Sequence, residues 1–92
     1  MNNANIIEFR VAKDTDTKKL ASAIYSNLQN VDELKLTCIG VPAVYQAIKS
    51  VINARGYSVP NGFDISVEPS FSVVIIDDTE ITCVILTLKR MK

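Results

Sequence analysis

The chain has 92 residues, 48% of them hydrophobic and 22% charged, so residues 1–92 can form one small domain but not two separate cores. This apolar content is typical of a globular protein and excludes a disordered chain. The 10 basic and 10 acidic side chains balance to a formal net charge of zero. That balance excludes a general DNA-coating protein with a large basic excess, although it allows a local basic patch.

The N-terminus and the hydropathy of the chain indicate where the protein resides. Residues 1–5 are polar and are expected to be flexible, and no basic segment followed by an apolar run marks a signal peptide. No apolar run approaches the roughly 20 residues that span a bilayer. The sequence therefore predicts a cytoplasmic protein with no membrane partner.

The first predicted strand covers Ile6 to Ala12, because apolar and charged side chains alternate there. The following segment, Asp14 to Asp16, contains residues that favour a helix N-terminus. Apolar residues then recur at helical spacing, which predicts a first helix ending near Gln29 or Asn30. The recurring residues are Leu20, Ala21, Ile24 and Leu28.

A second alternating strand runs from Leu34 to Cys38, and Gly40 ends it. Pro42 suits the first turn of the next helix, where a missing backbone N–H costs nothing. This second helix is predicted to stop at Gly56 and to bury one apolar stripe. The stripe consists of Val44, Ala47, Ile48 and Val51.

The last third of the chain reads as a loop followed by a long hairpin. Turn residues predict a loop over Tyr57 to Gly62. A third strand, Phe63 to Ile76, is interrupted at Pro69, which indicates a bulge or an edge position. A polar turn at Asp77 to Glu80 leads into a fourth strand, Ile81 to Leu88.

The predicted element order is βαβαββ, an α/β domain of the α+β sandwich type with a four-stranded mixed sheet. Two successive strand–helix–strand units favour right-handed crossovers, which place both helices on one face of the sheet. The hairpin strands are apolar on both faces, and the helices can cover only one. The excess apolar surface is either buried within the monomer or covered by a second copy, and the second reading predicts a homodimer.

No residues point to catalysis. The chain has no histidine, the usual general base at neutral pH and the commonest metal ligand, and its 3 scattered glycines make no phosphate-binding loop. Asp77, Asp78 and Glu80 could hold a hard cation, but a solvated hairpin tip explains them better. We therefore predict no catalytic residue, no metal, no cofactor and no enzymatic activity.

The cysteines Cys38 and Cys83 lie in apolar runs and belong to no C-x-x-C pair. They are expected to be reduced core residues. A disulfide would require them to be neighbours in space, which the sequence does not determine.

Two features could bind an anionic partner. One is basic residues at the first strand–helix junction and in the C-terminal tail, which could equally be solvated surface. The other is the helix start at Gly40, whose free backbone N–H groups and positive dipole end can hold a phosphate. Both strand–helix junctions should lie at the carboxyl edge of the sheet. The basic residues are Arg10, Lys13, Lys18 and Lys19 at the junction, and Lys89, Arg90 and Lys92 in the tail.

The segment from Cys38 onward contains an ordered set of residues: Ile39-Gly40, Pro42-Ala43, Gln46-Ala47-Ile48-Lys49, Ala54-Arg55-Gly56-Tyr57, Pro60, Gly62, Asp64, Pro69, Phe71, Ile76-Asp77, Glu80 and Thr82. This set resembles the stage V sporulation protein S family of bacteria. Specific matches extend over residues 34–88, whereas the first strand and helix agree only in pattern and length. The family is associated with late spore development and coat assembly, and its molecular activity is not well defined.

That family is similar in fold to Alba, an archaeal chromatin protein that binds DNA or RNA as a dimer. Alba proteins carry basic residues in the first strand–helix loop and at the start of the second helix. By position, the resemblance implies a nucleic-acid site formed by Lys13, Lys18, Lys19, Gly40, Val41, Pro42, Gln46 and Lys49.

The chain departs from Alba at Pro42 and Gln46, which stand where Alba tends to have basic residues. Two hypotheses follow from the resemblance and this departure. The first is an Alba-like dimer that binds nucleic acid through phosphate contacts in sporulation or developmental regulation. The alternative is a protein–protein interaction module in spore development that binds no nucleic acid.

Overall fold

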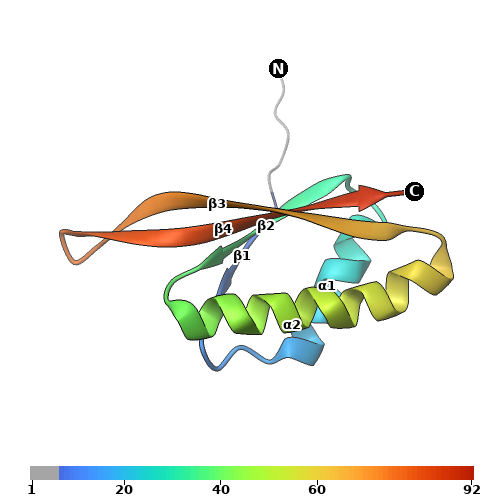
Figure 1. Ribbon diagram of the computed structural model, residues 1–92, viewed down its shortest axis with the longest axis horizontal. Coiled ribbons are helices and arrows are strands. Elements are labelled where there is room, and N and C mark those ends of the chain that lie inside the picture. The colour runs from blue at the N-terminus through green and yellow to red at the C-terminus, as the bar shows by residue number, and fades with distance from the viewer. Residues whose placement is uncertain (1–6) are drawn as a thin grey trace, which may run out of the picture.

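The computed structural model describes residues 7–92, so the expected flexibility of residues 1–5 lies outside the described part of the chain. The elements follow the predicted order (Figure 1). They are β1 (Glu8–Val11), α1 (Thr17–Leu28), β2 (Glu33–Cys38), α2 (Val41–Ser58), a short 3-10 turn (Val59–Asn61), β3 (Asp64–Ile76) and β4 (Thr79–Met91).

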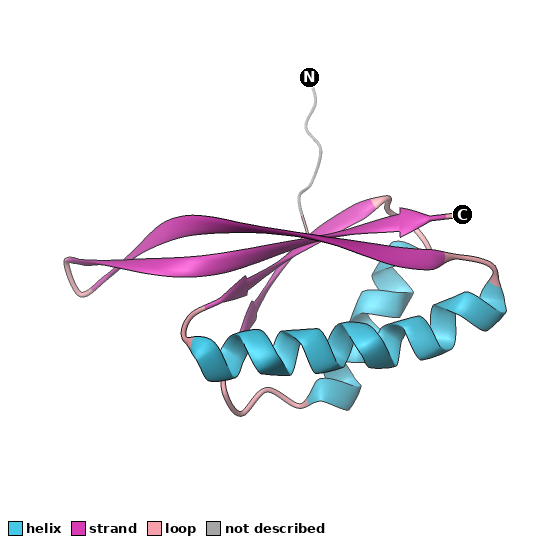
Figure 2. Cartoon of the chain, viewed as in Figure 1, coloured by secondary structure: helices cyan, strands magenta, loops and turns pink. Residues whose placement is uncertain are grey.

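The sheet is four-stranded and mixed, with strand order β1-β2-β4-β3. β1 and β2 are parallel, whereas β4 is antiparallel to both of its neighbours. β3 is therefore parallel to β2, and each helix is a crossover between parallel strands. Both helices lie on one face of the sheet (Figure 2), which confirms the predicted Alba-like arrangement.

Apolar side chains between the sheet and the helices form the core. α1 buries all four residues that its spacing predicted, and it ends one residue before Gln29. Each fully buried Leu or Ile contributes roughly 1.5–3 kcal/mol, so this layer supplies most of the stability. The principal core residues are Val11, Leu20, Ala21, Ile24, Leu28, Leu34, Leu36, Leu86 and Leu88.

The predicted apolar stripe of α2 is only partly correct. Small residues dominate its buried face, and Ile48 keeps 37% of its surface exposed. Small side chains let the helix approach the sheet and α1 closely. α2 carries apolar residues on two faces, and the predicted stripe mixed them. The buried residues are Ala43, Ala47, Ser50, Val51, Ala54 and Ser58.

The predicted end of α2 at Gly56 is wrong, and so is the loop predicted over Tyr57 to Gly62. The helix continues to Ser58 and tightens into the 3-10 turn. Gly62, with a φ of 103°, is the residue that leaves the helical region. That left-handed conformation is where glycine has its advantage over other residues.

Pro69 does not interrupt β3. The strand is continuous and lies at the edge of the sheet, so the edge expectation is correct and the bulge is absent from the described pairing. Ile76 and Thr79 form the hydrogen-bonded pair that closes the turn, and pairs alternate from there along the ladder. Pro69 and its partner Leu86 are therefore a non-hydrogen-bonded pair. Its missing N–H therefore faces away from β4 and costs no ladder bond.

The β3–β4 hairpin extends beyond the rest of the sheet. Cys38 pairs with Val84 at the last position of β2, whereas β3 and β4 remain paired as far as Ile76 and Thr79. The turn residues Asp77 and Asp78 have φ values of 51° and 61°, as in a two-residue type I′ turn. Residues 72–83 thus form a projecting two-stranded ribbon, the hairpin arm (Figure 1).

Candidate nucleic-acid interface

The first junction, between β1 and α1, is a tight loop that presents exposed lysines. The Ala12 N–H donates to Thr15 Oγ1 at 2.8 Å. Asp16 caps α1 by accepting hydrogen bonds from the Lys18 and Lys19 N–H groups at 3.0 and 3.1 Å. Because the protein's own carboxylate uses these N–H groups, the α1 N-terminus is not open to a second anion.

The second junction, between β2 and α2, has no such cap. Gly40 adopts a φ of 91° and ψ of 155°, and no side chain among residues 7–92 bonds to this helix start. Pro42 lacks an N–H, which leaves those of Val41 and Ala43 near the dipole's positive end. An anion can approach here, because Gly40, Val41 and Pro42 are exposed.

Gln46 connects the two junctions. Its Nε2 donates a hydrogen bond of 3.0 Å to the backbone carbonyl of Thr15. The bond spans 31 positions of sequence and holds the first junction loop against α2. Gln46 was predicted to contact a ligand, whereas its side-chain amide already holds the loop in place.

The edge of the sheet at which Gly40 to Pro42 lie therefore also carries Lys13, Lys18 and Lys19. All three lysines are exposed, and none has an ion pair within 4.0 Å in the described part of the chain. Lys49 lies farther along α2, where its Nζ sits 4.7 Å from the centre of the Tyr45 ring. We call residues 12–19 together with Gly40 to Pro42 the junction edge.

The basic C-terminal tail has a structural use. Arg90 Nη1 donates to the carbonyls of Leu28 and Gln29 at 2.8 and 3.2 Å, and Nη2 binds Asp32. It thereby satisfies carbonyl groups at the C-terminus of α1. Lys89 pairs with Glu68 at 3.2 Å. The tail is thus a poor candidate for phosphate contacts.

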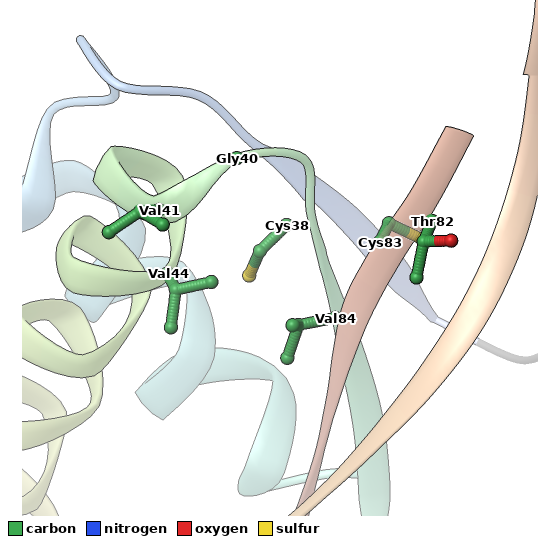
Figure 3. A pocket seen from close by; sticks show the side chains of 7 residues that line it. All are labelled: Cys38, Gly40, Val41, Val44, Thr82, Cys83 and Val84. Carbon is green, nitrogen blue, oxygen red and sulfur yellow. The ribbon is translucent and has the colours of Figure 1, made fainter.

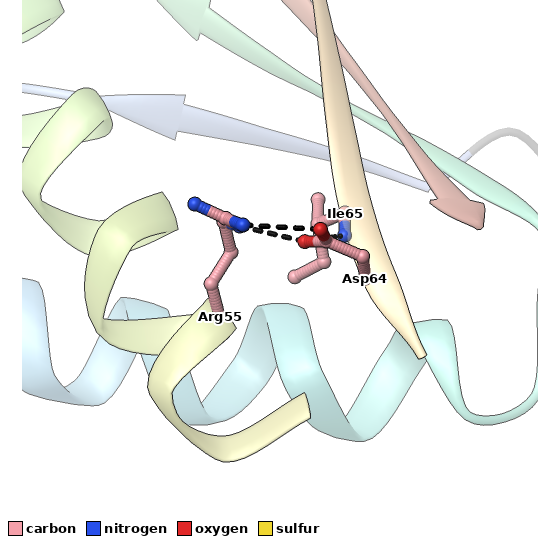
Figure 4. Close-up of polar contacts among 3 residues, drawn as sticks. All are labelled: Arg55, Asp64 and Ile65. Carbon is pink, nitrogen blue, oxygen red and sulfur yellow. Dashed lines mark hydrogen bonds and ion pairs between the residues drawn. The ribbon is translucent and has the colours of Figure 1, made fainter. Parts of the chain in front are cut away.

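An ion pair fixes the opposite end of α2 (Figure 4). Arg55 Nε and Nη2 donate to the Asp64 carboxylate at 2.6 and 3.0 Å, and the Ile65 N–H donates to the same carboxylate at 2.7 Å. These bonds, the one from Arg55 first, lower the pKa of Asp64 below its usual value. The pair ties the last turn of α2 to the start of β3.

Behind Gly40 lies an apolar hollow of about 190 Å³ (Figure 3), lined mainly by Cys38, Val41, Val44 and Val84. Val84 also lines a second hollow of about 340 Å³ on the hairpin. Large apolar side chains on α2 and β3 are exposed around these hollows. The apolar stripe predicted for the second helix did not reveal this exposed face. We call this surface the apolar flank: Val41, Tyr45, Ile48, Ile52, Phe71, Val73 and Ile75, which are 83, 63, 37, 60, 82, 55 and 64% exposed.

Cys38 and Cys83 are both free and buried, as predicted. Burial, with a smaller effect from Cys83, raises the pKa of Cys38 to about 11. Within residues 7–92, no group of three or more His, Cys, Asp or Glu side chains could hold a metal ion. No helix in that range is long and apolar enough to cross a membrane.

Comparison with known proteins agrees with the fold. A family model described as stage V sporulation protein S matches residues 7–91. Among solved structures, Alba from Thermoplasma volcanium is similar with a TM-score of 0.61 and 10% sequence identity, over 92% of this chain and 99% of that one. At this identity the structural likeness establishes the fold alone.

Proposed function

The chain belongs to the stage V sporulation protein S family, and from that premise we propose that it acts in sporulation or developmental regulation as a cytoplasmic, Alba-like homodimer that binds DNA or RNA. Family membership supports the sporulation role. The nucleic-acid role rests on the site itself. We propose no catalytic step.

The observation that carries this proposal is the junction edge. Gln46 holds the lysine-bearing loop beside the uncapped start of α2. Lysine ammonium groups and helix N-terminal N–H groups both bind phosphate oxygens, and neither reads bases. Binding should therefore depend on the backbone of the nucleic acid rather than on its sequence.

The footprint is small, so the affinity should be modest and sensitive to salt. Asp14 and Asp16 lie among the three lysines and reduce the local positive charge. Three phosphate contacts would give a slope of log K against log salt of about −2 for a single strand.

The test is a titration of labelled DNA and RNA at several salt concentrations. The variant Lys13→Gln/Lys18→Gln/Lys19→Gln should lose most of the binding. The control Lys35→Gln/Lys92→Gln removes charges away from the junction edge and should bind nearly as the wild type. Absence of binding at low salt, or binding that does not weaken as salt rises, would reject the proposal.

The homodimer is proposed from the apolar flank. Its α2 residues recur at helical spacing along one side of the helix, and its β3 residues lie on the helix-facing side of the hairpin. The hollow behind Gly40 and the hollow on the hairpin could receive apolar side chains of a second copy. Several large apolar side chains exposed on neighbouring elements of a small domain are typical of an association surface.

An alternative is a protein–protein interaction module without nucleic acid. Two contacts favour it: Asp16 occupies the N–H groups of α1, and Gln46 is engaged within the chain. Pull-downs from sporulating cells with and without nuclease would separate the two functions. Partners that survive nuclease support the interaction module, and partners lost on digestion support nucleic-acid binding.

A further inference from the structure

The hairpin arm leaves the sheet at the same edge as both junctions. β2 ends at Cys38, opposite Val84, and continues into the start of α2 at Gly40. β4 runs antiparallel to β2, so its first residues pass beyond that edge. At about 3.3 Å per residue, the stretch from Val84 to Asp78 carries the tip about 20 Å past the last β2 pair.

The tip of the arm is acidic. Asp77, Asp78 and Glu80 are exposed, and none has an ion pair within 4.0 Å in the range that the structure describes. Three negative charges therefore project past the edge where Lys13, Lys18 and Lys19 supply three positive ones. Charges this exposed act over a Debye length of about 8 Å at physiological salt.

We propose that the acidic hairpin arm restricts the junction edge to single-stranded nucleic acid. The inference rests on the proposed function and names its ligand class. A duplex is stiff over about 150 base pairs and carries one negative charge per about 1.7 Å of its axis. The strand order β1-β2-β4-β3 places the arm next to the junction that follows β2, so a duplex that lies along the line of the two junctions runs past the arm, where the acidic tip repels its phosphates.

A single strand avoids this repulsion. Its backbone is flexible, so it can contact the lysines and the start of α2 and then turn away from the arm. The repulsion falls only on a ligand that cannot bend within the width of the site. The arm thus acts on specificity while the lysines supply affinity.

The experiment compares single-stranded DNA, single-stranded RNA and duplex DNA of about 20 nucleotides, a length that exceeds common single-strand site sizes. Affinities are measured by fluorescence anisotropy at low salt. The key variant is Asp77→Asn/Asp78→Asn/Glu80→Gln. Asparagine tolerates the left-handed φ of both turn positions, so the variant removes charge without disturbing the turn. Glu33→Gln, at the opposite end of β2, is the control.

The wild type should bind single strands about 10-fold or more tightly than duplex, and the arm variant should narrow that ratio several-fold by gaining duplex affinity. The control should keep the wild-type ratio. Equal affinity of the wild type for duplex and single strand, or an unchanged ratio in the arm variant, overturns the inference alone. Failure of the wild type to bind any probe at low salt overturns the proposed function, and the inference with it.

Discussion

Gln46 illustrates how one side chain can organise a surface through a contact within the chain. Its amide bonds to the carbonyl of Thr15, and α2 thereby sets the position of the loop that bears Lys13. The resemblance placed Gln46 among the residues expected to contact nucleic acid, whereas its amide bonds within the chain. A substitution should thus affect stability and loop order directly, and binding only indirectly.

We predict that Gln46→Ala lowers the free energy of unfolding by about 1 kcal/mol, the usual net value of one partly buried hydrogen bond. Urea denaturation measures the loss. Gln29→Ala is the matched control, because the exposed Gln29 amide bonds only the Tyr25 hydroxyl, at 3.2 Å. If both variants lose the same free energy of unfolding, the bond between Gln46 and Thr15 stabilises the fold no more than the exposed bond of Gln29 does.

Asp64 should link stability to pH. Its pKa is lowered in the folded state by Arg55 first and then by the Ile65 N–H. The folded state therefore favours the ionised carboxylate, and this stabilisation is present above the unfolded pKa of about 3.9 and lost as the pH falls through the folded value.

Asp64→Asn should therefore be less stable than the wild type at neutral pH, and the difference should shrink below about pH 4. Denaturant unfolding of both proteins at a series of pH values measures this. A difference that is the same in acid and at neutral pH would show that the carboxylate's charge contributes nothing.

At the scale of the element, α2 shows which helix boundaries are determined by neighbouring residues in the sequence. Gly40 and Pro42 define its start, because both act through their own backbone geometry. Its end depends on Gly62, six positions beyond the glycine that was predicted to stop it. An unstrained helical glycine such as Gly56 only weakens a helix, and packing outweighs that cost.

Substituting alanine for each of these two glycines should change the free energy of unfolding in opposite directions. Gly56→Ala should stabilise the protein by about 0.5–1 kcal/mol, because a Cβ there meets nothing within 4 Å and alanine favours the helix. Gly62→Ala should destabilise by about 1 kcal/mol or more, because its φ of 103° is strained for any residue with a Cβ. Thermal or urea unfolding tests both, and changes of the same sign would contradict this assignment.

Elements and their order were predictable because each carries its own periodicity or cap, as Asp16 does for α1. The long-range contacts were not. The bonds of Gln46 to Thr15, Arg55 to Asp64 and Arg90 to the end of α1 join distant segments, and no local pattern marks them. The sequence could therefore name candidate binding residues, which remain a prediction, but it could not show that Gln46 is already engaged within the chain.

At the scale of the whole molecule, charge and apolar surface are segregated. The junction edge and the arm tip carry charges of opposite sign, whereas the apolar flank along α2 and β3 carries almost none. The monomer leaves this flank exposed to water. Its core is small, so a domain of this size is only marginally stable by itself. Burying the flank against a second copy would remove this cost, and stability would then depend on protein concentration.

The dimer can be tested at Ile52, which is 60% exposed in the single chain. Ile52→Glu should leave the monomer fold intact, because the side chain is outside the core, but it would place an unpaired charge in the proposed interface. Light scattering should give a mass near twice 10.1 kDa for the wild type and near 10.1 kDa for the variant. Asn53→Glu, one position along α2 and exposed on a different side of the helix, should remain dimeric. A monomeric wild type at micromolar concentration, or a dimeric Ile52→Glu variant, would show that the apolar flank does not hold a second copy.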